Sequence, residues 1–164
     1  MSVKVIFESM ALLIQQHKEL HQLSLKKTDL IKRNDIHQLH SLLKEESTLI
    51  RKMEETERAR HKATLRYLEE RDNNCPEGTV SELVKYLPEG YRNPLVKLQE
   101  NLLLEMTRLR EREAMNRMLL EDSLHFVQMT MDMIQPDPEA VHYTHPESKG
   151  GENVKGYSVF DSKA

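Results

Sequence analysis

Apolar residues between positions 3 and 72 recur with the period of an α-helix. At ~100° per residue they fall in one broad arc around Leu39, and charged residues fill most of the other positions. The arc contains Ile6, Met10, Leu13, Ile14, Leu20, Leu25, Ile31, Ile36, Leu42, Leu43, Leu49, Ile50 and Met53. The first 75 residues hold no glycine and no proline. The pattern predicts a long first helix over residues 3–72 and leaves open a joint at Asn34-Asp35.

Residues 73–94 interrupt this pattern with prolines and glycines. Inside the interruption, Thr79 is followed three residues later by Glu82, the spacing of a capping box in which each side chain bonds a free backbone N–H group. The spacing predicts a short helix over residues 80–87, with Thr79 as its N-cap.

A second long helix is predicted over residues 94–135, and it carries two apolar stripes. The first stripe lies within ~40° of Leu120, is interrupted by Glu113 and Asn116, and is sufficient to pack against the first long helix. Its members are Leu95, Leu98, Leu102, Met106, Leu109, Leu120, Leu124, Val127, Met131 and Ile134. The second stripe begins at residue 115 and lies ~140° away from the first. Its members are Met115, Met118, Leu119, Phe126, Met129 and Met133.

The two stripes together make residues 115–134 apolar over more than ~200°, whereas an ordinary surface helix shows an arc of ~100°. Such a segment needs partners on two sides. One interpretation is a buried helix end, covered by the short helix or by a second copy of the chain. The other is a docking surface for a helix of another protein, which the richness in methionine favours. The residues alone leave both interpretations open.

The last residues differ from the rest, because residues 136–164 are rich in proline, glycine, serine and charge. The predicted fold class is therefore all-α. It comprises an elongated antiparallel helical hairpin or bundle of two long helices plus a short connecting helix, over residues 1–135, and a disordered C-terminal tail over residues 136–164.

Composition and charge exclude some classes of function. The formal net charge is -3, and acids and bases alternate without a basic block, so the chain lacks the electrostatic pattern of nucleic-acid binding or of attraction to anionic membranes. No stretch approaches ~20 apolar residues, so we expect no membrane insertion. The N-terminus lacks the apolar run of a signal peptide, which predicts a cytoplasmic location.

Catalytic chemistry is not indicated. The single cysteine, Cys75, lies in a predicted turn without a histidine base beside it. His17 with His21, and His37 with His40, have helical spacings that can contribute to a zinc site, but no third or fourth ligand is evident. We therefore predict no catalytic residue, no metal, no cofactor and no enzymatic activity.

The run from Asn116 to Val127 resembles the C-terminal helix of FlgN-type flagellar export chaperones. The matching positions are Asn116, Leu119, Leu120, Leu124, Phe126 and Val127. The first helix agrees through Asn34-Asp35-Ile36, Leu39, Leu42, Glu46, Leu49 and Glu57-Arg58. The ending Phe160-Asp161-Ser162-Lys163-Ala164 looks like the closing residues of Gram-positive members. The likeness covers nearly the whole chain.

The resemblance implies a cytosolic chaperone for flagellar hook-associated proteins, the proteins of the hook–filament junction. It implies that residues 115–134 bind the C-terminal helical region of the client and prevent its premature assembly. It also implies delivery of the client to the export gate and ATPase complex of the flagellar type III secretion apparatus. In the family a tail tyrosine in a Tyr-Gly-x-x-Gly setting contacts the gate. Tyr143 stands nearest to that position, with Thr144 and Glu147 in place of the glycines, and Tyr157 is a second candidate.

Two further hypotheses concern the exposed apolar surface. Val159 and Phe160 form an adjacent bulky apolar pair in the tail and are a candidate plug for the empty face before a client arrives. The alternative function is a homodimeric coiled-coil structural or adaptor protein without an export role, whose second stripe closes the dimer.

Overall fold

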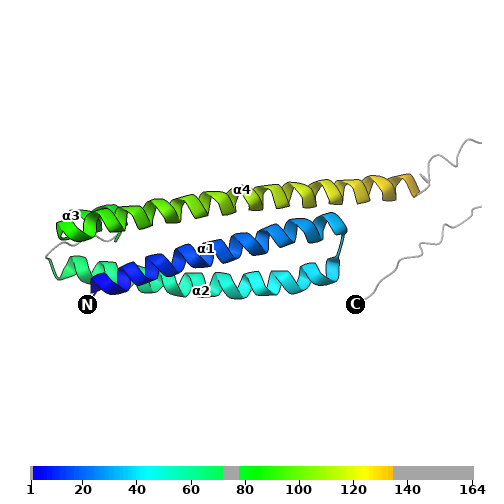
Figure 1. The fold of residues 1–164 in the computed structure, drawn as a ribbon. Helices are drawn as coiled ribbons and strands as arrows, with labels where there is room; N and C mark the ends of the chain where they lie inside the picture. Colours follow the sequence, from blue (N-terminus) through cyan, green and yellow to red (C-terminus); the bar gives the residue numbers. More distant parts are fainter. Residues whose placement is uncertain (1, 72–77, 135–164) are drawn as a thin grey trace, which may run out of the picture. The chain divides into compact units, whose positions relative to one another are not determined.

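The computed structural model describes residues 2–71 and 78–134. Four α-helices follow in chain order: α1 (Ser2–Arg33), α2 (Ile36–Glu69), α3 (Val80–Tyr86) and α4 (Glu89–Ile134) (Figure 1). These described residues contain no strand, so the predicted all-α class is confirmed. None of their helices is both long enough and apolar enough to cross a membrane.

The chain divides into two compact units, residues 1–125 and residues 126–164, and the boundary falls within α4. The second unit is described only over residues 126–134. The predicted division into a body over residues 1–135 and a tail over residues 136–164 stays a prediction, because that tail lies outside the described residues.

The joint left open in the first long helix is a tight turn at Asn34 and Asp35. Asn34 has a φ of 54°, a left-handed conformation that asparagine adopts more readily than most residues. Asp35 then caps α2, because its side chain accepts a hydrogen bond from the backbone N–H of Gln38 at 3.0 Å. The predicted segment 3–72 is consequently two helices, and α2 returns alongside α1 (Figure 1).

The short connecting helix forms where the capping box predicts it. The Thr79 hydroxyl accepts from the backbone N–H of Glu82 at 3.3 Å. Gly78 precedes it with a φ of 52°, and a side chain there would come within 3.1 Å of Leu65. Helix α4 begins at Glu89, earlier than the predicted residue 94, so Pro94 lies inside it.

The apolar core gathers residues from all four helical segments at one end of the first unit. Its fully or almost fully buried members are Ile6, Met10, Tyr67, Leu68, Leu83, Leu87 and Leu95. Burying a side chain of this kind contributes about 1.5–3 kcal/mol. Leu95 therefore anchors the start of α4 to α1, α2 and the segment around α3.

Candidate docking surface on helix α4

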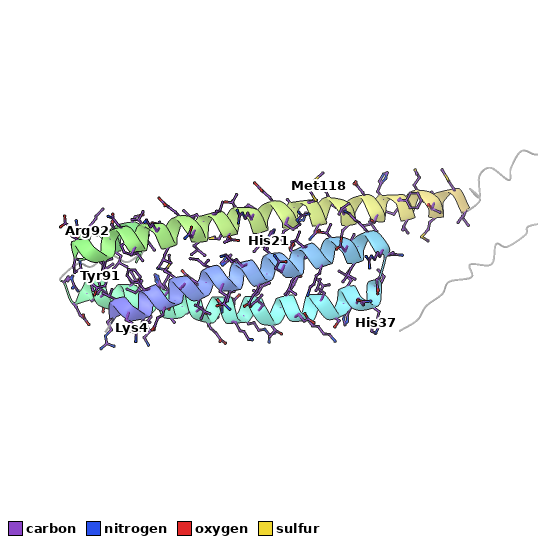
Figure 2. All side chains as sticks on the ribbon, viewed as in Figure 1. Lys4, His21, His37, Tyr91, Arg92 and Met118 are labelled. Carbon is purple, nitrogen blue, oxygen red and sulfur yellow. The ribbon has the colours of Figure 1, made fainter. Side chains whose placement is uncertain are left out.

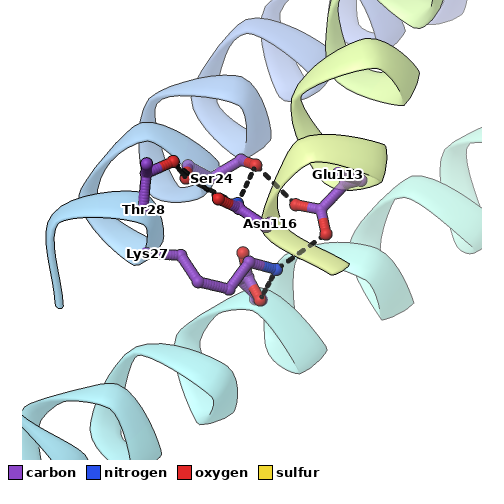
Figure 3. A network of polar contacts seen from close by, with 6 residues as sticks. Ser24, Lys27, Thr28, Glu113 and Asn116 are labelled. Atoms are coloured by element: carbon purple, nitrogen blue, oxygen red, sulfur yellow. Dashed lines mark hydrogen bonds and ion pairs between the residues drawn. The ribbon is translucent and has the colours of Figure 1, made fainter. Parts of the chain in front are cut away.

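A second anchor of α4 is polar and centres on Asn116, which is only 1% exposed. Its amide nitrogen donates to the backbone carbonyl of Ser24 at 2.9 Å and contacts the Ser24 hydroxyl at 3.1 Å. Its amide oxygen accepts from the Thr28 hydroxyl at 2.6 Å (Figure 3). Since both ends of the amide are satisfied, this buried polar group holds α4 against α1 at one register.

An ionic bridge lies beside Asn116 and joins three helices, and its most exposed member is Glu113, with a side chain that is 41% exposed. The ammonium group of Lys27 on α1 lies 2.9 Å from a carboxylate oxygen of Glu46 on α2 and 2.9 Å from one of Glu113 on α4 (Figure 3). The Ser24 hydroxyl donates to the other oxygen of Glu113 at 2.5 Å. The Lys27 side chain is 10% exposed and that of Glu46 is 7% exposed. The bridge therefore links the α1–α2 hairpin to α4.

Two opposing effects set the pKa of Lys27. Burial is the largest single effect and by itself lowers the pKa, because it disfavours the charged form. The hydrogen bonds and negative charges of Glu113 and Glu46 together outweigh burial, so the pKa of Lys27 is raised above its ordinary value. Lys27 is therefore a cation at neutral pH.

These contacts correct the interpretation of the first stripe of α4. Glu113 and Asn116, which the sequence pattern treats as interruptions, supply the contacts with α1. The stripe packs only near its start: Leu95 is buried, and Leu98 and Leu102 lie against the core. Further along the first unit, the predicted packing against the first helix is wrong, because Met106, Leu120 and Leu124 are exposed. The exposed members of the stripe are Met106, Leu120, Leu124, Val127, Met131 and Ile134.

The second stripe of α4 is open to solvent as well. In the first unit Met115 and Met118 are exposed and Leu119 is half-buried, and Figure 2 shows Met118 on the outer side of α4. In the second unit Phe126 and Met129 are exposed, and so is Met133. Helix α3 does not cover the part of this stripe in the first unit, because Leu83 and Leu87 hold α3 in the core beside Leu95. The interpretation in which the short helix α3 buries the end of α4 is therefore wrong for this part of the stripe.

The polar residues between the stripes of α4 leave the apolar surface undisturbed. The hydroxyls of Ser123 and Thr130 donate to the backbone carbonyls of Leu119 and Phe126, at 2.7 and 2.8 Å. Hydroxyls that are satisfied within their own helix do not require a partner from outside. The face of α4 can thus accept apolar side chains without leaving these groups unpaired.

The remaining candidates are the tail residues, the single cysteine and the histidine pairs. Tyr143 and Tyr157, the pair Val159 and Phe160, and Cys75 lie outside the described residues. Within residues 2–71 and 78–134, no group of three or more histidine, cysteine, aspartate and glutamate side chains could hold a metal ion.

Sequence reasoning missed Ser24, Lys27 and Thr28. A signal was present, because their spacing of i, i+3 and i+4 continues the apolar arc of the first helix with polar residues. A polar run on a buried face indicates a partner of matching polarity on the facing helix. In this chain that partner is the pair Glu113 and Asn116.

No solved structure matches the chain significantly. A curated relative, described as "Uncharacterized protein YvyG" of Bacillus subtilis (strain 168), is 30% identical over 164 residues, which cover 100% of both chains. The family model for FlgN protein matches residues 1–149. The chain therefore belongs to the FlgN family of flagellar export chaperones.

Proposed function

We propose that this chain binds the C-terminal helical region of flagellar hook-associated proteins on the second stripe of α4 and keeps them unassembled until export. The FlgN family is a family of chaperones rather than of enzymes. The observation that supports the proposal is the open second stripe: Phe126 is 64% exposed and Met133 is 77% exposed. Exposed apolar surface of this extent on a helix is typical of a protein-binding surface.

Binding on this stripe is driven by apolar burial. The six side chains of the stripe give about 9–18 kcal/mol at about 1.5–3 kcal/mol each. Association and the ordering of side chains cost about 4–15 kcal/mol. The two ranges overlap, so the gain from burial and the cost of association are of similar size, and charged residues flanking the stripe contribute selectivity. A reversible complex suits a chaperone that must release its client to the export apparatus.

Methionine suits this surface for a second reason. Its unbranched thioether side chain adopts many shapes, so a face built from Met115, Met118, Met129 and Met133 can adapt to more than one client helix. We propose that it accepts more than one hook-associated protein.

Delivery belongs to the same proposal. The client-loaded chaperone docks on the export gate and ATPase complex of the flagellar secretion apparatus, with Tyr143 as the gate contact. Val159 and Phe160 cover the second stripe in the absence of a client. The family resemblance supports the first of these roles, and the adjacent bulky apolar pair in the tail sequence supports the second.

The test uses the purified full-length chain and hook-associated proteins from the same bacterium. Replacing Phe126, Met129 and Met133 together with serine should abolish co-purification and leave the helical circular dichroism unchanged. The matched control replaces three residues of the first stripe on the same helix, Leu124, Val127 and Met131, and should retain client binding. Undiminished client binding by the first triple variant would show that the client lies elsewhere.

A further inference from the structure

One acidic residue lies inside the second stripe of α4. At ~100° per residue, Asp122 falls between Met115 and Met118 around the helix, ~20° from the first and ~40° from the second. It follows Met118 by about one turn, and Figure 2 shows Met118 on the outer side of α4. These three residues belong to the first unit. The stripe therefore presents a carboxylate among its apolar side chains.

The Asp122 carboxylate has no partner of its own. Asp122 is exposed and makes no hydrogen bond or ion pair with any residue in the described ranges 2–71 and 78–134, His125 included. Residues 118–134 contain no lysine and no arginine. Arg117 is close in the sequence but lies ~140° away from Asp122 around the helix. Helix α4 therefore supplies no lysine or arginine to this carboxylate.

The contact between α1 and α4 shows how this chain accommodates a carboxylate between two helices. Glu113 of α4 lies 2.9 Å from the ammonium group of Lys27 on α1, and it accepts a hydrogen bond from the Ser24 hydroxyl at 2.5 Å. A carboxylate that is covered by another helix needs such a cation, because the helix takes away the water that stabilised its charge. The same requirement applies to Asp122 when its stripe is covered.

A client helix on the second stripe covers Asp122. With its side chains a helix is about 10–12 Å across, and Asp122 lies about 6 Å from Met118 along α4 at 1.5 Å per residue. A helix that packs against Met115, Met118 and Leu119 therefore removes water from the carboxylate as well. Covering an ionised carboxylate without a partner costs more free energy than the burial of one neighbouring apolar side chain gains.

We propose that the client helix carries a lysine or arginine within its apolar face, and that this cation pairs with Asp122. The proposal rests on the client binding at the second stripe, as proposed above. The aliphatic part of a lysine or arginine packs along Met118 and Leu119, while its charged end reaches the carboxylate. An arginine donates two parallel hydrogen bonds to a carboxylate, which also fixes the register of the client helix.

Asp122 thereby selects among apolar helices. A helix with an uninterrupted apolar face offers more apolar area, but it buries the carboxylate unpaired and is rejected. A helix with a cation at the matching position is accepted. The apolar side chains of the stripe supply affinity, and the single carboxylate among them decides which helix binds.

Replacing Asp122 with leucine tests the proposal through the sign of its effect. Asp122→Leu adds apolar surface, so it would tighten client binding if the carboxylate only disturbed the stripe. If the carboxylate pairs with a client cation, the leucine leaves that cation covered and unpaired. We then expect the full-length chain to bind its hook-associated protein at least tenfold more weakly, as measured by surface plasmon resonance. Unchanged or tighter binding would overturn the proposal.

The kinetics and a matched control separate a covered ion pair from a general effect of charge. Loss of a covered pair raises the dissociation rate, whereas loss of a charge at the rim changes mainly the association rate. Glu121→Leu makes the same kind of exchange at the neighbouring exposed position, ~100° away around the helix. It should leave the dissociation rate unchanged. Equal effects of the two substitutions would overturn the proposal, since net charge alone would explain them.

A scan of the client identifies the cation. Each lysine and arginine in the C-terminal helical region of the hook-associated protein is replaced by leucine and measured against the wild-type chain and against Asp122→Leu. One replacement should weaken binding to the wild type at least tenfold and restore most of the affinity for Asp122→Leu, because an apolar pair replaces the ion pair. Additive effects at every position would contradict the pairing.

The ion pair and the proposed function fail in different ways. If the triple variant at Phe126, Met129 and Met133 still binds its client, the client does not lie on the second stripe and both proposals fail. If the triple variant loses its client while Asp122→Leu binds as tightly as the wild type, only the ion pair is wrong. Asp122→Leu should keep the circular dichroism of the wild type, because Asp122 is exposed and makes no contact that the described fold requires.

Discussion

Asn116 of α4 and Thr28 of α1 lie 88 residues apart in the sequence and are joined by a buried hydrogen bond of 2.6 Å. Together with the Asn116–Ser24 contacts, this bond fixes which residue of α4 faces which residue of α1. Leu95 fixes the start of the same helix through apolar packing. Helix α4 is thus anchored at two points of different chemistry.

Replacing Asn116 with leucine should destabilise the fold by about 1–3 kcal/mol, because polar groups of Ser24 and Thr28 would be buried without their partner. Urea denaturation followed by circular dichroism measures the change. The matched control is Asn101→Leu on the same helix, where Asn101 is exposed, and it should change stability by less than about 0.5 kcal/mol. Equal effects of the two substitutions would contradict the anchoring role of Asn116.

Replacing Lys27 with methionine should cost about 3–5 kcal/mol, since Glu46 would remain buried as an unpaired charge beside Glu113. Lys26→Met, at an exposed neighbouring position, should be nearly neutral. Adding Glu46→Leu and Glu113→Leu to Lys27→Met should restore most of the lost stability. A triple variant that is no more stable than Lys27→Met would show that the carboxylates have other partners.

The ionic bridge also predicts a pH dependence. The pKa of Lys27 is raised in the folded chain above its ordinary value of 10.5. The stabilisation by the Lys27 charge is therefore fully present below pH 10.5 and is lost as the pH rises through the folded pKa. The stability difference between the wild type and Lys27→Met should be constant near neutral pH and shrink in strong alkali. A difference that grows with alkali would reverse the assigned sign.

Asn34 should respond to substitution according to backbone conformation. Asn34→Gly should be close to neutral, because glycine adopts a φ of 54° without strain. Asn34→Ala should destabilise the chain by about 1–2 kcal/mol, because a β-carbon opposes the left-handed conformation. Thermal unfolding of the two variants measures the difference. Equal melting temperatures would indicate that the turn relaxes to another conformation.

The helices, the short connector and its Thr79 cap could be predicted from local pattern, because capping and periodicity involve neighbours in sequence. The turn at Asn34 was indicated only as a joint left open, because it contains no glycine or proline and the apolar arc continues across it. That arc continues because α1 and α2 face the same core. A single wheel cannot distinguish one long helix from two that share an interior.

The exposed apolar stripe of the candidate site could be predicted from the sequence, but the polar contacts that hold α4 against α1 could not. The second stripe was visible because apolar residues at helical spacing stand out wherever they lie. Glu113 and Asn116 were misinterpreted because a wheel counts any polar residue as a break. Their partner Ser24 lies 92 residues from Asn116, a distance over which local pattern carries no information.

The polar anchor at Asn116 would also protect the fold against the client helix proposed for α4. A client helix that attaches by apolar side chains competes for apolar surface wherever it finds it, including the surface between α4 and α1. At the anchor it has nothing to replace the Thr28 hydroxyl, the Ser24 carbonyl or the charge of Lys27. A client helix that took the place of α1 would leave the Asn116 amide buried without its partners. If the second stripe of α4 binds a client as proposed, the chain can expose this apolar helix face without being unfolded by the client.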